Sequence, residues 1–75
     1  MKWKNYIETD PNILFGKPVI KGTRISVELV LEKLGNGMSE DDLLEAYPHL
    51  SKEQVQACIA YASDQLKSEI AYSDG

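Results

Sequence analysis

The stretch ISVELVLEKLGNGMSEDDLLEAYPHLSKEQVQAC, residues 25–58, decides the fold because it repeats one helix-start signal three times. A serine precedes each of three apolar-periodic segments, at Ser26, Ser39 and Ser51. Each serine oxygen can accept a hydrogen bond from a free N–H of the first helical turn. Apolar residues stand one position before and four positions after each serine, the pattern of a hydrophobic staple. These staple pairs are Ile25 with Val30, Met38 with Leu43, and Leu50 with Val55. Ser51 and Gln54 also form a capping box, so three helices are predicted.

The spacing predicts helices over about residues 27–34, 40–46 or 47, and 52–70. Gly35-Asn36-Gly37 ends the first helix, since glycine and asparagine tolerate left-handed backbone. Pro48 ends the second helix. The predicted apolar stripe of the third helix is Val55, Cys58, Ile59, Ala62, Leu66 and Ile70, with Tyr61 on a second face beside Gln54, Ala57 and Gln65.

The first 25 residues predict an arm of strand and turn. We expect a short strand over residues 3–7 and a turn at Asp10-Pro11-Asn12. The segment GKPVIKGTRI, residues 16–25, predicts a short hairpin or a structured turn, with Gly22 at the positive-φ position of a type II turn. The expected fold is therefore mainly α: a three-helix, helix-turn-helix (homeodomain-like) bundle with a short N-terminal β/turn segment. It forms one domain over residues 1–75, with an arm at 1–25 and a trihelical unit at 26–75.

Composition excludes several classes of protein. A single cysteine rules out an internal disulfide, and one cysteine with one histidine cannot make a protein-only zinc site. Cys58 is predicted to be a buried structural thiol. No apolar run reaches the length of a membrane span, and the N-terminus lacks the apolar region of a secretory signal, so we expect a cytoplasmic protein. His49 has no triad partner nearby and the carboxylates lie on solvated faces, so we expect no enzyme, cofactor, metal or small-molecule substrate.

Charge is unevenly distributed along the chain. The net charge is −4, yet residues 1–26 hold five basic against two acidic side chains, and residues 27–75 hold three against ten. The balances are therefore +3 and −7. Such polarity suits a protein with one anionic and one cationic partner. Solubility alone is the alternative interpretation.

Two segments are candidates for DNA contact. The basic turn carries Lys17, Lys21, Thr23 and Arg24. In a helix-turn-helix geometry the third helix would present Lys52, Gln54 and Gln56 to bases or phosphates. The helix-turn-helix spacing is imperfect, because Glu45 and His49 replace a small residue and a glycine. The alternatives are a packing helix, a solvated turn, and an Arg24 that pairs with Glu28 instead of DNA.

Residues 7–62 carry an ordered set of short motifs: Asp10-Pro11, Gly16-Lys17-Pro18, Gly22-Thr23-Arg24-Ile25, Gly37 and Tyr47-Pro48. In this order the motifs resemble the prokaryotic domain-of-unknown-function family number 433. The resemblance implies a helix-turn-helix-like trihelical fold that is often dimeric. Many members look like VapB-type antitoxins, encoded beside a nuclease toxin with a PIN-like fold.

The resemblance and the charge pattern together predict an antitoxin-like DNA-binding protein. It would repress its operon by binding operator DNA and would neutralise a PIN-like toxin through its acidic C-terminal helix. The predicted partner-binding residues are Tyr61, Gln65, Glu69 and Tyr72. We also expect a homodimer, paired through strand 3–7, because the aromatic residues exceed what three short helices can bury. These are Trp3, Tyr6, Phe15, Tyr61 and Tyr72. The alternative is a protein-interaction module without DNA binding.

Overall fold

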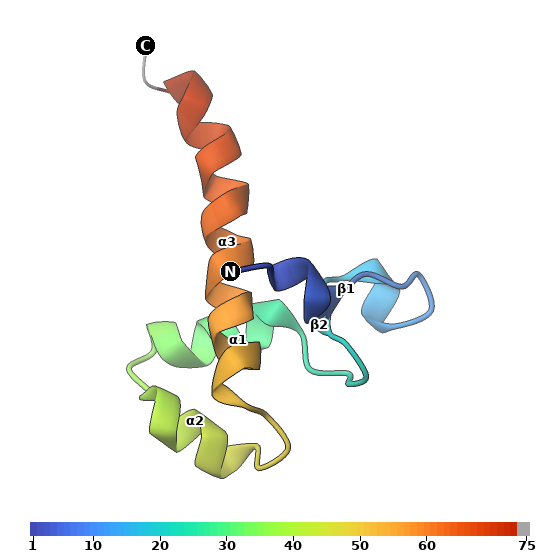
Figure 1. Cartoon of the computed structure of the whole chain (residues 1–75), viewed down its shortest axis with the longest axis vertical. Helices are drawn as coiled ribbons and strands as arrows, with labels where there is room; N and C mark the ends of the chain where they lie inside the picture. Colours follow the sequence, from blue (N-terminus) through green and yellow to red (C-terminus); the bar gives the residue numbers. More distant parts are fainter. Residues whose placement is uncertain (74–75) are drawn as a thin grey trace.

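The computed structural model describes the backbone of residues 1–73 and the side chains of residues 1–67. Its three helices are α1 (Val27–Gly35), α2 (Glu40–Ala46) and α3 (Lys52–Ser73). Figure 1 shows α1 and α2 packed around the first half of α3, while the second half of α3 extends beyond them. The fold is mainly helical with a short two-stranded N-terminal segment, as predicted. Within the described chain, no helix combines the length and the apolar character needed to cross a membrane.

All three predicted serine caps are present. Ser26 Oγ accepts a hydrogen bond from the Leu29 N–H at 3.0 Å, and Ser39 Oγ accepts one from the Asp42 N–H at 3.0 Å. The capping box of α3 is complete: Ser51 Oγ accepts from the Gln54 N–H at 3.2 Å, and Gln54 Oε1 accepts from the Ser51 N–H at 2.8 Å. These bonds satisfy N–H groups that the helix itself leaves free. The helix starts are therefore confirmed, while α3 ends three residues later than predicted.

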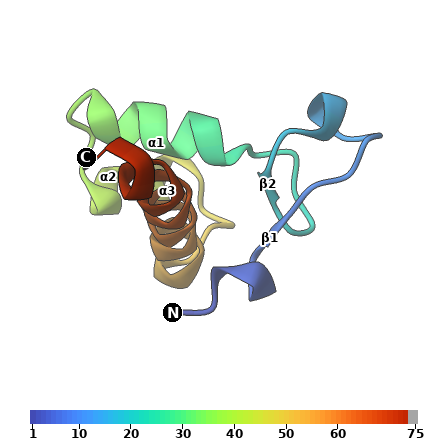
Figure 2. The same cartoon turned by 90° about the horizontal axis from the view of Figure 1, so that it is seen from above.

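The prediction of a strand over residues 3–7 is wrong. Trp3–Asn5 forms a single 3-10 turn (η1), and the strand β1 is confined to Ile7–Glu8. Trp3 turns toward α3, where its ring meets Tyr61 edge-on with centroids 4.8 Å apart, and its Nε1–H donates to Asp64. Packing the half-buried indole against α3 requires the chain to turn at residues 3–5, which a continuous strand would prevent. Figure 2 shows this N-terminal turn beside α3.

The strand β1 pairs antiparallel with β2 (Val19–Ile20), with Ile7 opposite Ile20 and Glu8 opposite Val19. Beyond β2 the chain closes the predicted hairpin. The Ile20 N–H donates to the Ile25 carbonyl at 2.9 Å, and the Val27 N–H donates to the Pro18 carbonyl at 3.0 Å.

The hairpin turn has the predicted geometry. Gly22 has a φ of +77°, and the Thr23 N–H donates to the Ile20 carbonyl at 3.0 Å. The turn upstream is also present, since the Asn12 N–H donates to Asp10 Oδ1 at 2.8 Å.

The arm and the helices share one core. Its buried residues are Ile7, Ile20, Val27, Val30, Leu43, Leu50, Val55, Ala57 and Cys58. The buried face predicted for α3 is only partly correct, because Ile59 and Leu66 are 46% and 55% exposed while Ala57 is fully buried. Both η1 and β1 pack on α3 in addition to α1 and α2, so the covered face includes the side of Ala57. The Ile70 side chain lies outside the described residues.

Candidate functional site

The basic turn begins at Lys17 before β2 and continues in the hairpin between β2 and α1, which projects from the body of the molecule (Figure 1). Lys21 and Arg24 are exposed and form no ion pair within the described chain. Lys17 differs, because its Nζ lies 2.9 Å from Glu28 Oε1. The suggested pairing of Arg24 with Glu28 is therefore wrong, because Glu28 forms its ion pair with Lys17. Two of the three cations remain available to a ligand.

Thr23 holds the turn together. Its Oγ1 donates to the Ile20 carbonyl at 2.8 Å and accepts from the Ile25 N–H at 3.0 Å. The hydroxyl thus has both a donor and an acceptor inside the chain. Thr23 shapes the surface that carries Lys21 and Arg24.

The start of α3 supplies the other predicted DNA-contacting residues. Lys52 and Gln56 are exposed, whereas Gln54 is half-buried and uses its amide oxygen in the capping box. The first turn of α3 and the basic turn both lie toward the end of the molecule opposite the C-terminal end of α3 (Figure 1).

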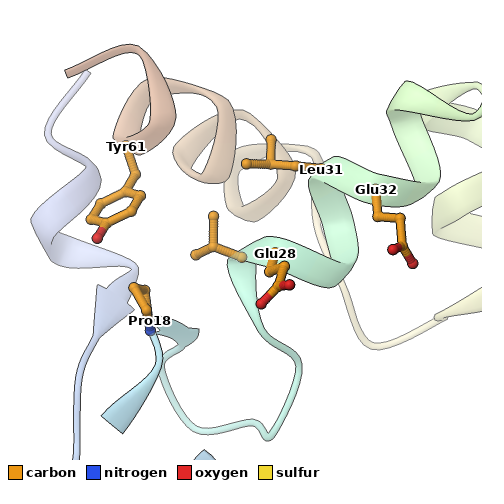
Figure 3. A pocket seen from close by; sticks show the side chains of 6 residues that line it. Pro18, Glu28, Leu31, Glu32 and Tyr61 are labelled. Carbon is orange, nitrogen blue, oxygen red and sulfur yellow. The ribbon is translucent and has the colours of Figure 1, made fainter. Parts of the chain in front are cut away.

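An apolar groove of about 480 Å³ lies between the arm and two helices. It is bordered by Pro18 before β2, Leu31 of α1 and Tyr61 of α3 (Figure 3). Glu28 and Glu32 of α1 form an acidic rim. The spacing of residues 28, 31 and 32 places them on one side of a helix, but the contributions of Pro18 and Tyr61 depend on the tertiary fold. The sequence therefore carried only part of the signal for this groove.

The predicted partner-binding residues have different surroundings. Tyr61 is half-buried against Trp3 and borders the groove. Gln65 is exposed. The side chains of Glu69 and Tyr72 lie outside the described residues.

A second hollow of about 450 Å³ runs along α3 where the helix leaves the body. Its lining residues are Ile59, Ala62, Ser63, Leu66 and Lys67. Positions 59, 62 and 66 follow the spacing of an apolar helix seam. We call this surface the α3 stripe.

The loop between β1 and β2 carries the most exposed aromatic side chain among the described residues. Phe15 is 100% exposed, and Leu14, Phe15 and Gly16 have φ values of 47°, 58° and 82°. Three successive residues are thus left-handed, a conformation that costs energy for residues other than glycine. We call residues 14–16 the Phe15 knob.

Cys58 is buried in the core as predicted. Burial raises the pKa of its thiol to about 11, so the thiol is protonated at neutral pH. His49 is exposed at the turn before α3. Among the described residues, no three histidine, cysteine or carboxylate side chains converge on a point where a metal could bind.

The comparisons with known proteins agree with this fold. The family model described as a protein of unknown function (DUF433) matches residues 7–62. The uncharacterised protein y4eO of Sinorhizobium fredii (strain NBRC 101917 / NGR234) is 36% identical over 59 residues, which cover 79% of this chain but only 27% of y4eO. The crystal structure of a DUF433 member protein from Anabaena variabilis superposes with a TM-score of 0.77 at 31% identity, and the match covers 91% of this chain and 70% of that one.

Proposed function

This chain belongs to DUF433, a family of proteins of unknown function, and we propose that it acts as an antitoxin-like DNA-binding protein. It would bind operator DNA to repress its own operon, and it would bind and neutralise a PIN-like nuclease toxin in the cytoplasm. One observation carries this proposal. Two chemically unlike surfaces lie on different parts of the molecule: the basic turn belongs to the arm, and the α3 stripe lies on α3 where that helix leaves the body (Figure 1). Two such surfaces allow one chain to hold an anionic and an apolar partner together.

The basic turn supports the DNA part of the proposal. Phosphates attract cations that have no intramolecular partner, and Lys21 and Arg24 meet that condition within the described chain. Arg24 adds a planar fork that contacts phosphate or guanine through two hydrogen bonds. Lys52 and Gln56 at the start of α3 are the additional candidates. Lys17 contributes less, because Glu28 offsets its charge.

The α3 stripe supports the toxin part of the proposal. Ile59 and Leu66 are both about half exposed, and burying such side chains favours protein association. Gln65 lies on the same exposed part of α3. The contributions of Glu69 and Tyr72 to toxin binding remain predictions from the sequence. Tyr61 contributes indirectly, because its ring already packs on Trp3.

Fluorescence anisotropy with duplex DNA from upstream of the gene tests the DNA part. We expect binding that weakens as salt increases, because phosphate contacts release counterions. Arg24→Gln should weaken binding by roughly tenfold or more, the scale of one bidentate contact. Lys67→Gln is the matched control: it removes the same charge from an exposed position on the α3 stripe, and should bind nearly as well as the wild type.

Equal losses for Arg24→Gln and Lys67→Gln would contradict a DNA site at the basic turn. An Arg24→Gln variant with a lower melting temperature and unchanged affinity would assign Arg24 to the fold. If the wild type shows no salt-dependent binding to DNA, alone or with its partner, the proposed DNA-binding function is wrong.

The second candidate is an interaction module that binds protein only. The net charge of −4 and the Lys17–Glu28 pair favour it, because both reduce attraction to phosphate. Leu66→Asp separates the two functions, since it places a charge on the α3 stripe far from the basic turn. We expect it to abolish co-purification with the toxin encoded beside the gene while leaving DNA affinity within about twofold, because a single distant charge is screened. If the wild type binds the toxin but not DNA, and Leu66→Asp abolishes toxin binding, the protein is an interaction module.

A further inference from the structure

We propose that the Phe15 knob is a docking anchor, and that it inserts into the groove bordered by Pro18, Leu31 and Tyr61 on a second copy of this chain. The second copy returns the same contact, so that two knobs fill two grooves. This inference goes beyond the proposed function and gives the homodimer expected from the sequence a defined interface.

The knob exposes an aromatic ring to water on a strained backbone, and both features are energetically unfavourable. Phe15 is fully exposed, and Leu14 and Phe15 both adopt left-handed backbone that only glycine tolerates without strain. Two hydrogen bonds fix the loop: the Gly16 N–H donates to the Ile13 carbonyl at 3.0 Å, and the Lys17 N–H donates to the Leu14 carbonyl at 3.2 Å. Strained residues of this kind cluster at binding sites, where the strain positions a side chain for use. A rigid, exposed aromatic side chain is also the usual anchor of a protein interface.

The groove has the chemistry to receive such a ring. Its walls are the apolar side chains of Pro18, Leu31 and Tyr61, with the ring of Tyr61 standing at one end (Figure 3). An aromatic ring that enters can pack on Tyr61 at an offset or edge-on, the arrangements that such pairs prefer. Groove and knob are therefore matched in polarity.

Charge complementarity favours a second copy of this chain as the occupant. Lys17 already offsets the charge of Glu28 at the edge of the groove, so Glu32 carries the uncompensated negative charge there. The knob lies in residues 1–26, whose overall charge balance is positive. Glu32 forms no ion pair within the described chain and is open to a cation of the incoming loop. Opposite charges around an apolar contact fix its register and speed its formation.

The positions of the knob and the groove on one molecule allow a closed, two-fold symmetric dimer. The Lys17–Glu28 contact ties the base of the knob to the wall of the groove, so the two features are neighbours on one molecule. A two-fold axis between neighbouring features brings each knob to the other groove and leaves no open end. Two phenylalanine rings bury on the order of 150–250 Å² each, less than the ~800 Å² per partner of a standard interface. The dimer should therefore be weak and depend on concentration.

Sedimentation velocity over a concentration series, without DNA or toxin, tests the interface. We expect the wild type to shift from monomer to dimer at roughly tens to hundreds of micromolar, the range of a small interface. Phe15→Gly should weaken the dimer at least tenfold without lowering the melting temperature, because glycine relieves the left-handed strain. Glu32→Lys should weaken it by a smaller factor. Glu45→Lys is the matched control, since Glu45 is exposed on α2 and does not line the groove.

Mixing the two variants gives a sharper result. A pair made of one Phe15→Gly chain and one Glu32→Lys chain has one intact knob seated in one unaltered groove. Because the second contact carries both substitutions and the first carries none, the mixed pair should associate more strongly than the geometric mean of the two self-association constants, as equal mixtures with one labelled component would show. Substitutions that act independently of one another would give that mean.

Two results would overturn the proposal: a wild type that stays monomeric throughout, or a dimer unaffected by Phe15→Gly. If a dimer unaffected by Phe15→Gly dissociates with Leu66→Gln, the interface lies on the α3 stripe. DNA binding is absent from this experiment, so its outcome is independent of whether the basic turn binds DNA.

Discussion

The trihelical unit and the N-terminal arm are organised by different kinds of interaction. Each helix of the trihelical unit begins at a serine whose hydroxyl caps it locally, within three residues of sequence. The arm has two strands of only two residues each, and their pairing joins Ile7 to Ile20 across twelve intervening residues. Its first turn is held by Trp3, whose partners Tyr61 and Asp64 lie on α3.

This contrast indicates where stability originates in so small a domain. The caps set the positions of the helices, and the arm completes a core that the helices alone do not close. Ile7 and Ile20 of the arm are buried together with Leu43 and Val55 of the helices. A two-stranded hairpin is marginal by itself in water, so the arm is ordered because it packs on α3. We therefore expect the two regions to fold as one cooperative unit.

Truncating a buried residue in each region is the strongest test of that view. Ile20→Ala should lower the free energy of unfolding by about 2–5 kcal/mol, as expected for a fully buried aliphatic side chain. Leu43→Ala, equally buried in the trihelical unit, should cost a similar amount. Urea melts of both variants measure the costs. A loss below about 1 kcal/mol for Ile20→Ala would show that the arm folds separately from the helices.

The pH dependence of stability tests how well arm and helices exclude water from Cys58. Its pKa is raised to about 11 in the folded state, so above the ordinary value of 9.0 the unfolded chain loses the thiol proton first. The unfolded state then binds fewer protons, and stability must fall as pH rises from about 9 to about 11. The slope contributed is at most about 1.4 kcal/mol per pH unit. Urea melts across this range should show a shallower slope for Cys58→Ala, and equal slopes would mean that water reaches the thiol.

Capping supplies the smallest of the three effects. Ser51→Ala should destabilise the protein by about 1 kcal/mol, because it removes the hydroxyl that accepts from the Gln54 N–H. Ser39→Ala removes a cap without a reciprocal partner and should cost about the same or less. Thermal melts of the two variants compare them directly. A Ser51→Ala variant as stable as the wild type would show that packing of Leu50 and Val55 alone sets the start of α3.

Sequence reasoning succeeded where the determinants were local. The positions of α1, α2 and the start of α3 followed from the three serines, and the hairpin turn followed from Gly22. It failed at residues 3–7, where five residues are too few to distinguish a strand from a turn and the Trp3–Tyr61 contact decides. Among the predicted DNA-contacting residues, it located the basic turn but did not reveal that Lys17 pairs with Glu28 or that Gln54 is used in a cap.

By itself, the sequence determined the number, starts and caps of the helices, the positive-φ turn at Gly22 and the separation of charge along the chain. These features depend on hydrogen bonds and backbone preferences that act within a few residues. Only the tertiary structure decided which face of α3 is covered, because Ile59 and Ala57 are both apolar and the packing of the arm selects Ala57. It also decided the groove beside Tyr61 and the exposure of Phe15, since both depend on segments far apart in sequence. Short-range interactions set the positions of helices and turns. Which side chains become buried depends on the segments that pack over them, and those segments can be distant in sequence.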